Sequence, residues 1–231
     1  MSKKTISSIV VLLLCSVFSW AQDTVEQDTK AMSAIAKQWT GKTIRVTTSH
    51  PNAPIHDYAN ALCSQFMNYS PCAAMVDYLK KPGQYTWEEK HYIVDDAPRN
   101  GYIQCDMGGQ CDYKAEVCYW RRPNGHALVA MLMQIGSEGE GVNTVNALLF
   151  YDYNPKTRTL SPDLKIKQFF DSFLKKHKNA GTPCIYLPKE NKDISVGYVK
   201  WDPEEDFLYE NYLLKWTGNA FTEKVTGADW E

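Results

Sequence analysis

The chain has 231 residues, of which 44% are hydrophobic and 13% are aromatic, and its formal net charge is −2 at pH 7. This composition supplies enough apolar surface for a sizeable core, which excludes a disordered chain. The slightly negative charge and the lack of a basic block argue against nucleic acid as a partner.

The N-terminal segment has the pattern of a signal peptide. Two lysines precede an apolar run from Ile9 to Phe18, and the small residues Ser19 and Ala21 stand three and one positions before Gln22. This order is typical of exported chains, and the run is shorter than the roughly 20 apolar residues of a membrane-spanning helix. We expect cleavage after residue 21, leaving residues 22–231 as a single exported α+β domain without a transmembrane segment.

A lipid anchor is the alternative to free export. Cys15 lies inside the apolar run, and acylation of this cysteine would make the chain a lipoprotein. Leu14 stands before it, where lipoprotein signals have a small residue, so ordinary cleavage is favoured. The expected location is therefore periplasmic or extracellular.

Helical spacing dominates the first third of the mature chain. A first helix is expected at about Thr29–Trp39, and Pro54–Tyr69 has apolar residues along one stripe. Ser70 and Pro71 are typical of an N-cap followed by proline in the first turn, and this third helix should end before Pro82.

The pattern then changes to strands rich in aromatic and β-branched residues. Asn124-Gly125 predicts a tight hairpin turn. The strand after it, His126–Ile135, is apolar on both faces and should therefore be central in a sheet. The other expected strands are Tyr85–Val94, Tyr102–Asp106, Tyr113–Arg121, Val142–Tyr153, Cys184–Leu187, Ile194–Trp201, Asn211–Trp216 and Phe221–Val225.

A long helix is expected between these strands, beginning at Ser161-Pro162 and reaching Lys176. The predicted fold is thus α+β: an antiparallel meander sheet of about six to eight strands, packed by the long helix and by an N-terminal helical pair.

Six cysteines follow the signal peptide, and an even count in an exported chain favours disulfides. Cys105 with Cys111 is the favoured pair because together they would close a short turn. Cys63 and Cys72 form a second candidate pair, since both face inward from adjacent helices. Free buried thiols are the alternative. A metal site is disfavoured because close C-x2-C pairs are lacking, and no cofactor is expected.

Motifs of common enzyme classes, such as G-x-S-x-G and H-E-x-x-H, are missing. His91 lies near Glu88, Glu89, Asp95 and Asp96, which could form an acid/base or metal site. An exposed polar strand face is the favoured interpretation of this segment.

The other histidines give weaker signals. His56 is expected on the solvated side of its helix, and His126 on the exposed end of the hairpin.

Aromatic residues are the more informative signal for binding. Trp87 and Trp201 border polar or acidic segments and are the first candidates for an exposed ligand site, whereas most of the tryptophans are expected in the core.

Three segments carry a resemblance to a group of known proteins. Tyr119-Trp120, the run Leu148–Thr157, and the run Tyr212–Trp216 followed by Gly218 and Phe221 resemble uncharacterised small secreted proteins of Bacteroidetes type. The resemblance covers about the C-terminal half of the mature chain. It implies export and an α+β fold, and it carries over no catalytic residue.

These observations predict a secreted or periplasmic, non-enzymatic binding protein, with Trp87, Trp201 and His91 as candidate ligand-binding residues. The expected partner is a protein or glycan of the envelope or the extracellular space. The alternative is an extracytoplasmic hydrolase that acts on a glycan or peptide, with acidic residues and His91 in its site.

Overall fold

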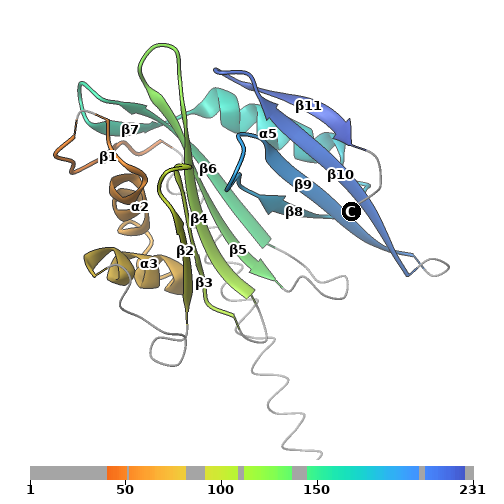
Figure 1. Ribbon diagram of the computed structural model, residues 1–231. Helices are drawn as coiled ribbons and strands as arrows, with labels where there is room; N and C mark the ends of the chain where they lie inside the picture. The colour runs from red at the N-terminus through yellow and green to blue at the C-terminus, as the bar shows by residue number, and fades with distance from the viewer. Residues whose placement is uncertain are drawn as a thin grey trace, which may run out of the picture.

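The computed structural model describes residues 41–50, 52–81, 92–108, 112–136, 145–202 and 206–226. This part of the chain forms two antiparallel sheets and three helices (Figure 1). The predicted signal peptide and the helix expected at Thr29–Trp39 lie outside the described residues. None of the described helices combines the length and hydrophobicity needed to cross a membrane.

The larger sheet has seven strands in the order β1-β7-β6-β5-β4-β3-β2. Its strands are β1 (Ile44–Arg45), β2 (Ile93–Ala97), β3 (Tyr102–Asp106), β4 (Asp112–Arg121), β5 (Ala127–Gly136), β6 (Val145–Asn154) and β7 (Thr159–Pro162). The smaller sheet has four strands in the order β11-β10-β9-β8. These are β8 (Thr182–Tyr186), β9 (Ile194–Asp202), β10 (Asp206–Trp216) and β11 (Phe221–Thr226).

Helices α2 (Ile55–Cys63) and α3 (Ser70–Lys80) cover one face of the seven-stranded sheet, and helix α5 (Leu164–Lys176) covers the other face together with the smaller sheet (Figure 1). Helices α2 and α3 pack on their face through a cluster of buried apolar side chains. Helix α5 and the four-stranded sheet share a second cluster on the other face. The described molecule thus has two cores, separated by the seven-stranded sheet.

Strand β5 is the middle strand of this sheet, as its sequence predicts. Nine of its ten residues are buried. Odd-numbered residues such as Met131 face α2 and α3, and even-numbered residues such as Leu132 face α5 and the smaller sheet. The two-sided apolar pattern arises because a core lies on each side of the strand.

The hairpin between β4 and β5 is also confirmed. The amide of Arg122 donates to the carbonyl of His126 at 2.9 Å, and Gly125 has a φ of +82°. Only glycine adopts this backbone region without steric cost, which is why Asn-Gly pairs are frequent in such turns.

Helix α2 is shorter than its apolar spacing predicts. It ends at Cys63, and the amides of Gln65 and Phe66 donate to carbonyls three residues earlier, which tightens the chain into a turn. Phe66 is still buried, so the apolar spacing continues beyond the helix.

The expected N-cap at Ser70 and the expected start of the long helix at Ser161-Pro162 are both wrong. Ser70 is the first residue of α3, and Tyr69 occupies the cap position without a side-chain bond. Ser161 and Pro162 belong to β7, where they pair with β6. The cap of α5 is Asp163, whose Oδ1 accepts from the amide of Ile166 at 3.1 Å.

The single predicted sheet is two sheets in the structure. The mixed α+β class and the antiparallel pairing are as expected. However, β8 to β11 pair only with one another among the described strands. Of the strand expected at Tyr85–Val94, residues 85–91 lie outside the described residues.

The disulfide predictions are wrong for the described cysteines. No disulfide bond involves Cys63, Cys72, Cys105, Cys118 or Cys184, and all of these but Cys184 are buried. Cys111, the expected partner of Cys105, lies outside the described residues. Cys63 and Cys72 do face inward as predicted, but the Cys63 thiol donates to Sδ of Met75 at 3.4 Å.

Candidate functional site

The candidate ligand-binding residues from the sequence are not brought together in the described structure. Trp87 and His91 lie outside the described residues, as do Glu88 and Glu89. Trp201 lies in β9, and its side chain is likewise outside the described part of the molecule.

The two remaining carboxylates of the His91 segment point to opposite faces of β2. Asp95 pairs with Lys189 at 2.5 Å, on the side of the smaller sheet. Asp96 pairs with His56 at 2.9 Å and accepts a hydrogen bond from Tyr78 at 3.1 Å, on the helix side. The expectation that His56 is merely solvated is wrong, because this contact with Asp96 joins α2 to the sheet edge.

His126 is likewise part of an ion-pair cluster. Its Nδ1 lies 2.6 Å from Asp152, which also pairs with Arg122. Arg122 in turn contacts the helix cap Asp163 at 2.5 Å. This cluster ties the β4–β5 hairpin to the start of α5, so its role is structural.

A pocket of about 420 Å³ opens where the β2–β3 turn and the end of β4 meet the segment between β8 and β9. This is within the size range of small-molecule sites. Its lining residues are Arg99, Asn100, Tyr119, Trp120 and Arg121 on one side, and Pro188, Glu190, Asn191 and Lys192 on the other.

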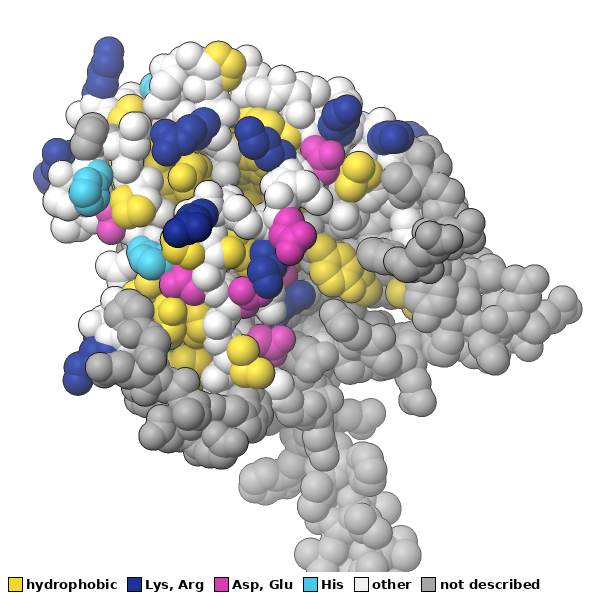
Figure 2. Space-filling view, viewed as in Figure 1, with side chains coloured by type: hydrophobic (Ala, Val, Ile, Leu, Met, Phe, Trp, Pro, Cys, Tyr) yellow, Lys and Arg dark blue, Asp and Glu magenta, His cyan; other side chains and the backbone are white. Residues whose placement is uncertain are grey.

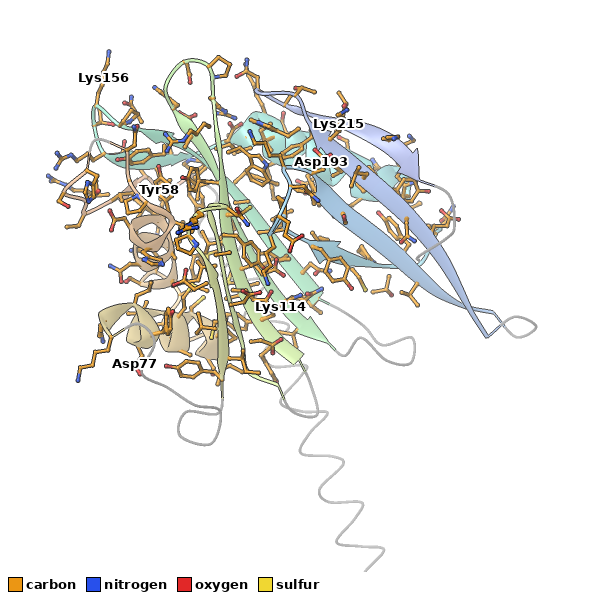
Figure 3. The ribbon with its side chains drawn as sticks, in the orientation of Figure 1. Tyr58, Asp77, Lys114, Lys156, Asp193 and Lys215 are labelled. Carbon is orange, nitrogen blue, oxygen red and sulfur yellow. The ribbon has the colours of Figure 1, made fainter. Side chains whose placement is uncertain are left out.

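The first wall of the pocket is fixed by Tyr119. The Tyr119 ring packs edge-on against Tyr58, with ring centroids 5.4 Å apart. Figure 3 shows Tyr58 on the helix side of the sheet. Gly101, with a φ of +72°, lies so close that a Cβ there would be 2.7 Å from Cε1 of Tyr119. The ring is therefore held between a helix and a turn.

The second wall is the segment 187–193, which contacts both sheets. The indole Nε1 of Trp120 donates to the carbonyl of Lys192 at 2.7 Å. Asp193 accepts from the backbone amide of Trp216 at 2.9 Å, and Figure 3 shows it near the start of β9. With the Lys189–Asp95 pair, these contacts hold the segment at three points. The pocket is thus formed by anchored elements.

The charges in the pocket are mostly positive. Arg99, Arg121 and Lys192 line it together with one carboxylate, Glu190, and all four residues are exposed. Among the described residues, no ion pair involves any of the three cations. The Arg121 guanidinium lies over the Tyr119 ring, 5.8 Å from its centroid. On the face shown in Figure 2, Lys and Arg side chains are spread over the surface, with Asp and Glu side chains among them.

A buried ion pair lies beside the pocket, between the sheets. Lys114 Nζ is 3.0 Å from Oε1 of Glu116, and the side chain of Glu116 is 2% exposed. Oε2 of Glu116 accepts from the amide of Leu187 and from the Tyr102 hydroxyl, each at 3.2 Å. Burial raises the pKa of Glu116, although Lys114 and the hydrogen bonds oppose the rise. Because this carboxyl is enclosed, it cannot reach a substrate.

The side chains that line the pocket are suited to binding a ligand. Cationic side chains, two amide side chains and an aromatic ring are groups that bind and orient a polar ligand. Within the described ranges, no group of three or more His, Cys, Asp or Glu side chains has an arrangement that would hold a metal ion.

The chain matches no protein-family model, no curated protein and no solved structure. The resemblance to secreted proteins of Bacteroidetes type therefore stays a prediction.

Sequence reasoning missed this pocket because its walls are far apart in the chain. Residues 99–101 follow Pro98 and residues 189–192 follow Pro188. Both stretches consist of polar or glycine residues, which is typical of loops in general. No local pattern predicts that these two segments lie together. They are brought together only by the pairing of the strands that flank each of them.

Proposed function

We propose that the mature chain is a secreted or periplasmic, non-enzymatic binding protein whose ligand site is the pocket between the β2–β3 turn and the segment 187–193. The observation that carries the proposal is the anchoring of both walls. Tyr119 is wedged against Tyr58 and Gly101, and Trp120 is hydrogen-bonded to Lys192. A preformed site binds without the entropic cost of ordering its walls.

The hydrolase alternative has less support from the same residues. Glycoside hydrolysis uses two carboxyl groups about 5–9.5 Å apart across the scissile bond. Glu190 is the one carboxylate that lines the pocket, and the nearby Glu116 is enclosed between the sheets. The geometry of the described residues therefore favours binding.

A ligand screen by thermal unfolding tests the proposal. A ligand that binds only the folded state, present at 100 times its Kd, should raise the unfolding free energy by about 2.7 kcal/mol and Tm by roughly 5–10 °C. The panel consists of glycans, peptides and small anions. The Arg99→Gln/Arg121→Gln double variant should lose the shift. The Arg45→Gln variant is the matched control, because Arg45 is exposed on β1 and does not line the pocket. A ligand that shifts both variants equally would place its site elsewhere.

A further inference from the structure

Two kinds of recognition chemistry line the pocket. Arg99, Arg121 and Lys192 offer N–H donors and positive charge, which suit an oxyanion. Glu190 offers only acceptor oxygens when ionised, and it would repel a ligand that is anionic throughout. A fitting ligand therefore has an anionic group at one point and hydrogen-bond donors at another.

Resting on the proposed function of this pocket, we infer that the ligand is an acidic sugar, meaning a sugar unit with a carboxylate or a sulfate group. The acid group lies against the arginine side chains, and the ring hydroxyls donate to Glu190. The side-chain amides of Asn100 and Asn191 both donate and accept, so they complement hydroxyl groups.

The placement of Arg121 supports this ligand class. Its guanidinium lies over Tyr119, whose ring is held in turn by Tyr58 and Gly101. The cation is thereby ordered before a ligand arrives, which reduces the entropic cost of forming a two-pronged bond to an oxyanion. The net charge of the chain is negative, so the positive charge of this pocket is opposite in sign to that of the whole chain.

A peptide ligand fits the same residues less well. An acidic peptide would satisfy the arginines and Lys192, but it would bring few donors to Glu190 apart from its backbone amides. A sugar acid has several hydroxyl donors within one ring of its acid group. The presence of Glu190 among the lining residues thus favours a sugar over a peptide.

The test is calorimetric titration of the mature chain with four probes of matched size. The probes are a uronic-acid oligosaccharide, a sulfated oligosaccharide, the neutral parent oligosaccharide and an acidic peptide. We expect one of the two acidic sugars to bind at least tenfold more tightly than the neutral parent, with affinity falling as salt is added. The stronger of the two identifies the acid group.

Two variants separate the two halves of the site. Arg121→Gln should lower the affinity for the acidic sugar about tenfold or more and leave the affinity for the neutral parent unchanged. Glu190→Gln should lower the affinity for both the acidic and the neutral sugar and leave the affinity for the peptide unchanged. Arg45→Gln should change none of these affinities.

Each contrary result has a definite meaning. Equal binding of acidic and neutral sugars would overturn the acidic-sugar inference and leave the binding function standing. Binding of the peptide without either sugar would also overturn it. If some other ligand class binds and both pocket variants bind it normally, the proposed function of the pocket fails as well.

Discussion

The backbone amide of Leu187 donates to Oε2 of Glu116, a carboxyl group enclosed between the two sheets. Leu187 directly precedes the pocket residue Pro188, so the base of one pocket wall rests on a buried ion pair. This relationship links the stability of the molecule to the shape of its candidate site.

The first prediction concerns pH. Burial raises the pKa of Glu116 above its ordinary 4.5, so the folded chain keeps a proton that the unfolded chain has already lost. The free energy of unfolding should therefore fall as pH rises from about 4.5 through the raised pKa. Glu116→Gln should remove this part of the pH dependence. Urea unfolding of both proteins from pH 4 to pH 8 measures it.

Glu223→Gln is the control, because it should act with the opposite sign. Hydrogen bonds from Lys176 and His177 lower the pKa of Glu223, so its contribution is complete above pH 4.5 and is lost as pH falls. Parallel stability curves for wild type and Glu116→Gln would contradict the first prediction.

The second prediction concerns Lys114, the cation of the buried pair. Figure 3 shows it on the side of the sheet opposite to Tyr58. Lys114→Met leaves Glu116 enclosed without its cation, and we expect a loss of about 3 kcal/mol in unfolding free energy at neutral pH. The Lys114→Met/Glu116→Gln double variant should recover much of the loss, since it leaves no unpaired charge. A double variant as unstable as Lys114→Met would show that the lysine acts through packing.

The third prediction compares two glycines with left-handed backbone. Gly101 (φ +72°) faces the Tyr119 ring, whereas a Cβ on Gly125 (φ +82°) would meet no atom within 4 Å. Gly125→Ala should cost about 1–2 kcal/mol for the backbone alone. Gly101→Ala should cost a further 1 kcal/mol or more, because the added methyl group displaces the ring. Equal losses in chemical denaturation would mean that Tyr119 moves freely.

The fourth prediction concerns the thiols. Burial raises the pKa of Cys72, Cys105 and Cys118, and the thiolate is the reactive form. In the native protein, iodoacetamide should modify Cys184 and spare these three together with Cys63. In denaturant without reductant, all five should react. Mass spectrometry of the peptides measures each site, and a cysteine that needs reductant before it reacts would reveal a disulfide.

Sequence patterns predicted the parts of the fold that depend on local burial. The alternation in His126–Ile135 predicted a central strand because each face of β5 contacts a separate core. The helical stripe predicted the inward direction of Cys63 and Cys72, since burial follows spacing. Their bonding state was predicted wrongly, because two inward side chains need a particular distance and angle to form a disulfide.

Features that depend on distant partners were beyond these patterns. Ser161-Pro162 has the residues of a helix start, yet pairing with β6 places it in a strand, and Asp163 caps the helix. The hydrogen bond between His56 and Asp96 joins residues 40 positions apart. The pocket likewise requires Trp120 to meet Lys192, which are 72 positions apart.

The two-sided burial of β5 has a consequence for how the molecule opens. Helices α2 and α3 pack on one face of this strand, and α5 with the smaller sheet packs on the other. Loss of either layer therefore exposes the apolar face of β5 that the layer had covered. The backbone amides of β5 should therefore exchange with deuterium only when the whole molecule unfolds, whereas those of α3 and β11 should exchange through smaller openings. A truncated chain without either layer should aggregate through the exposed face of the sheet.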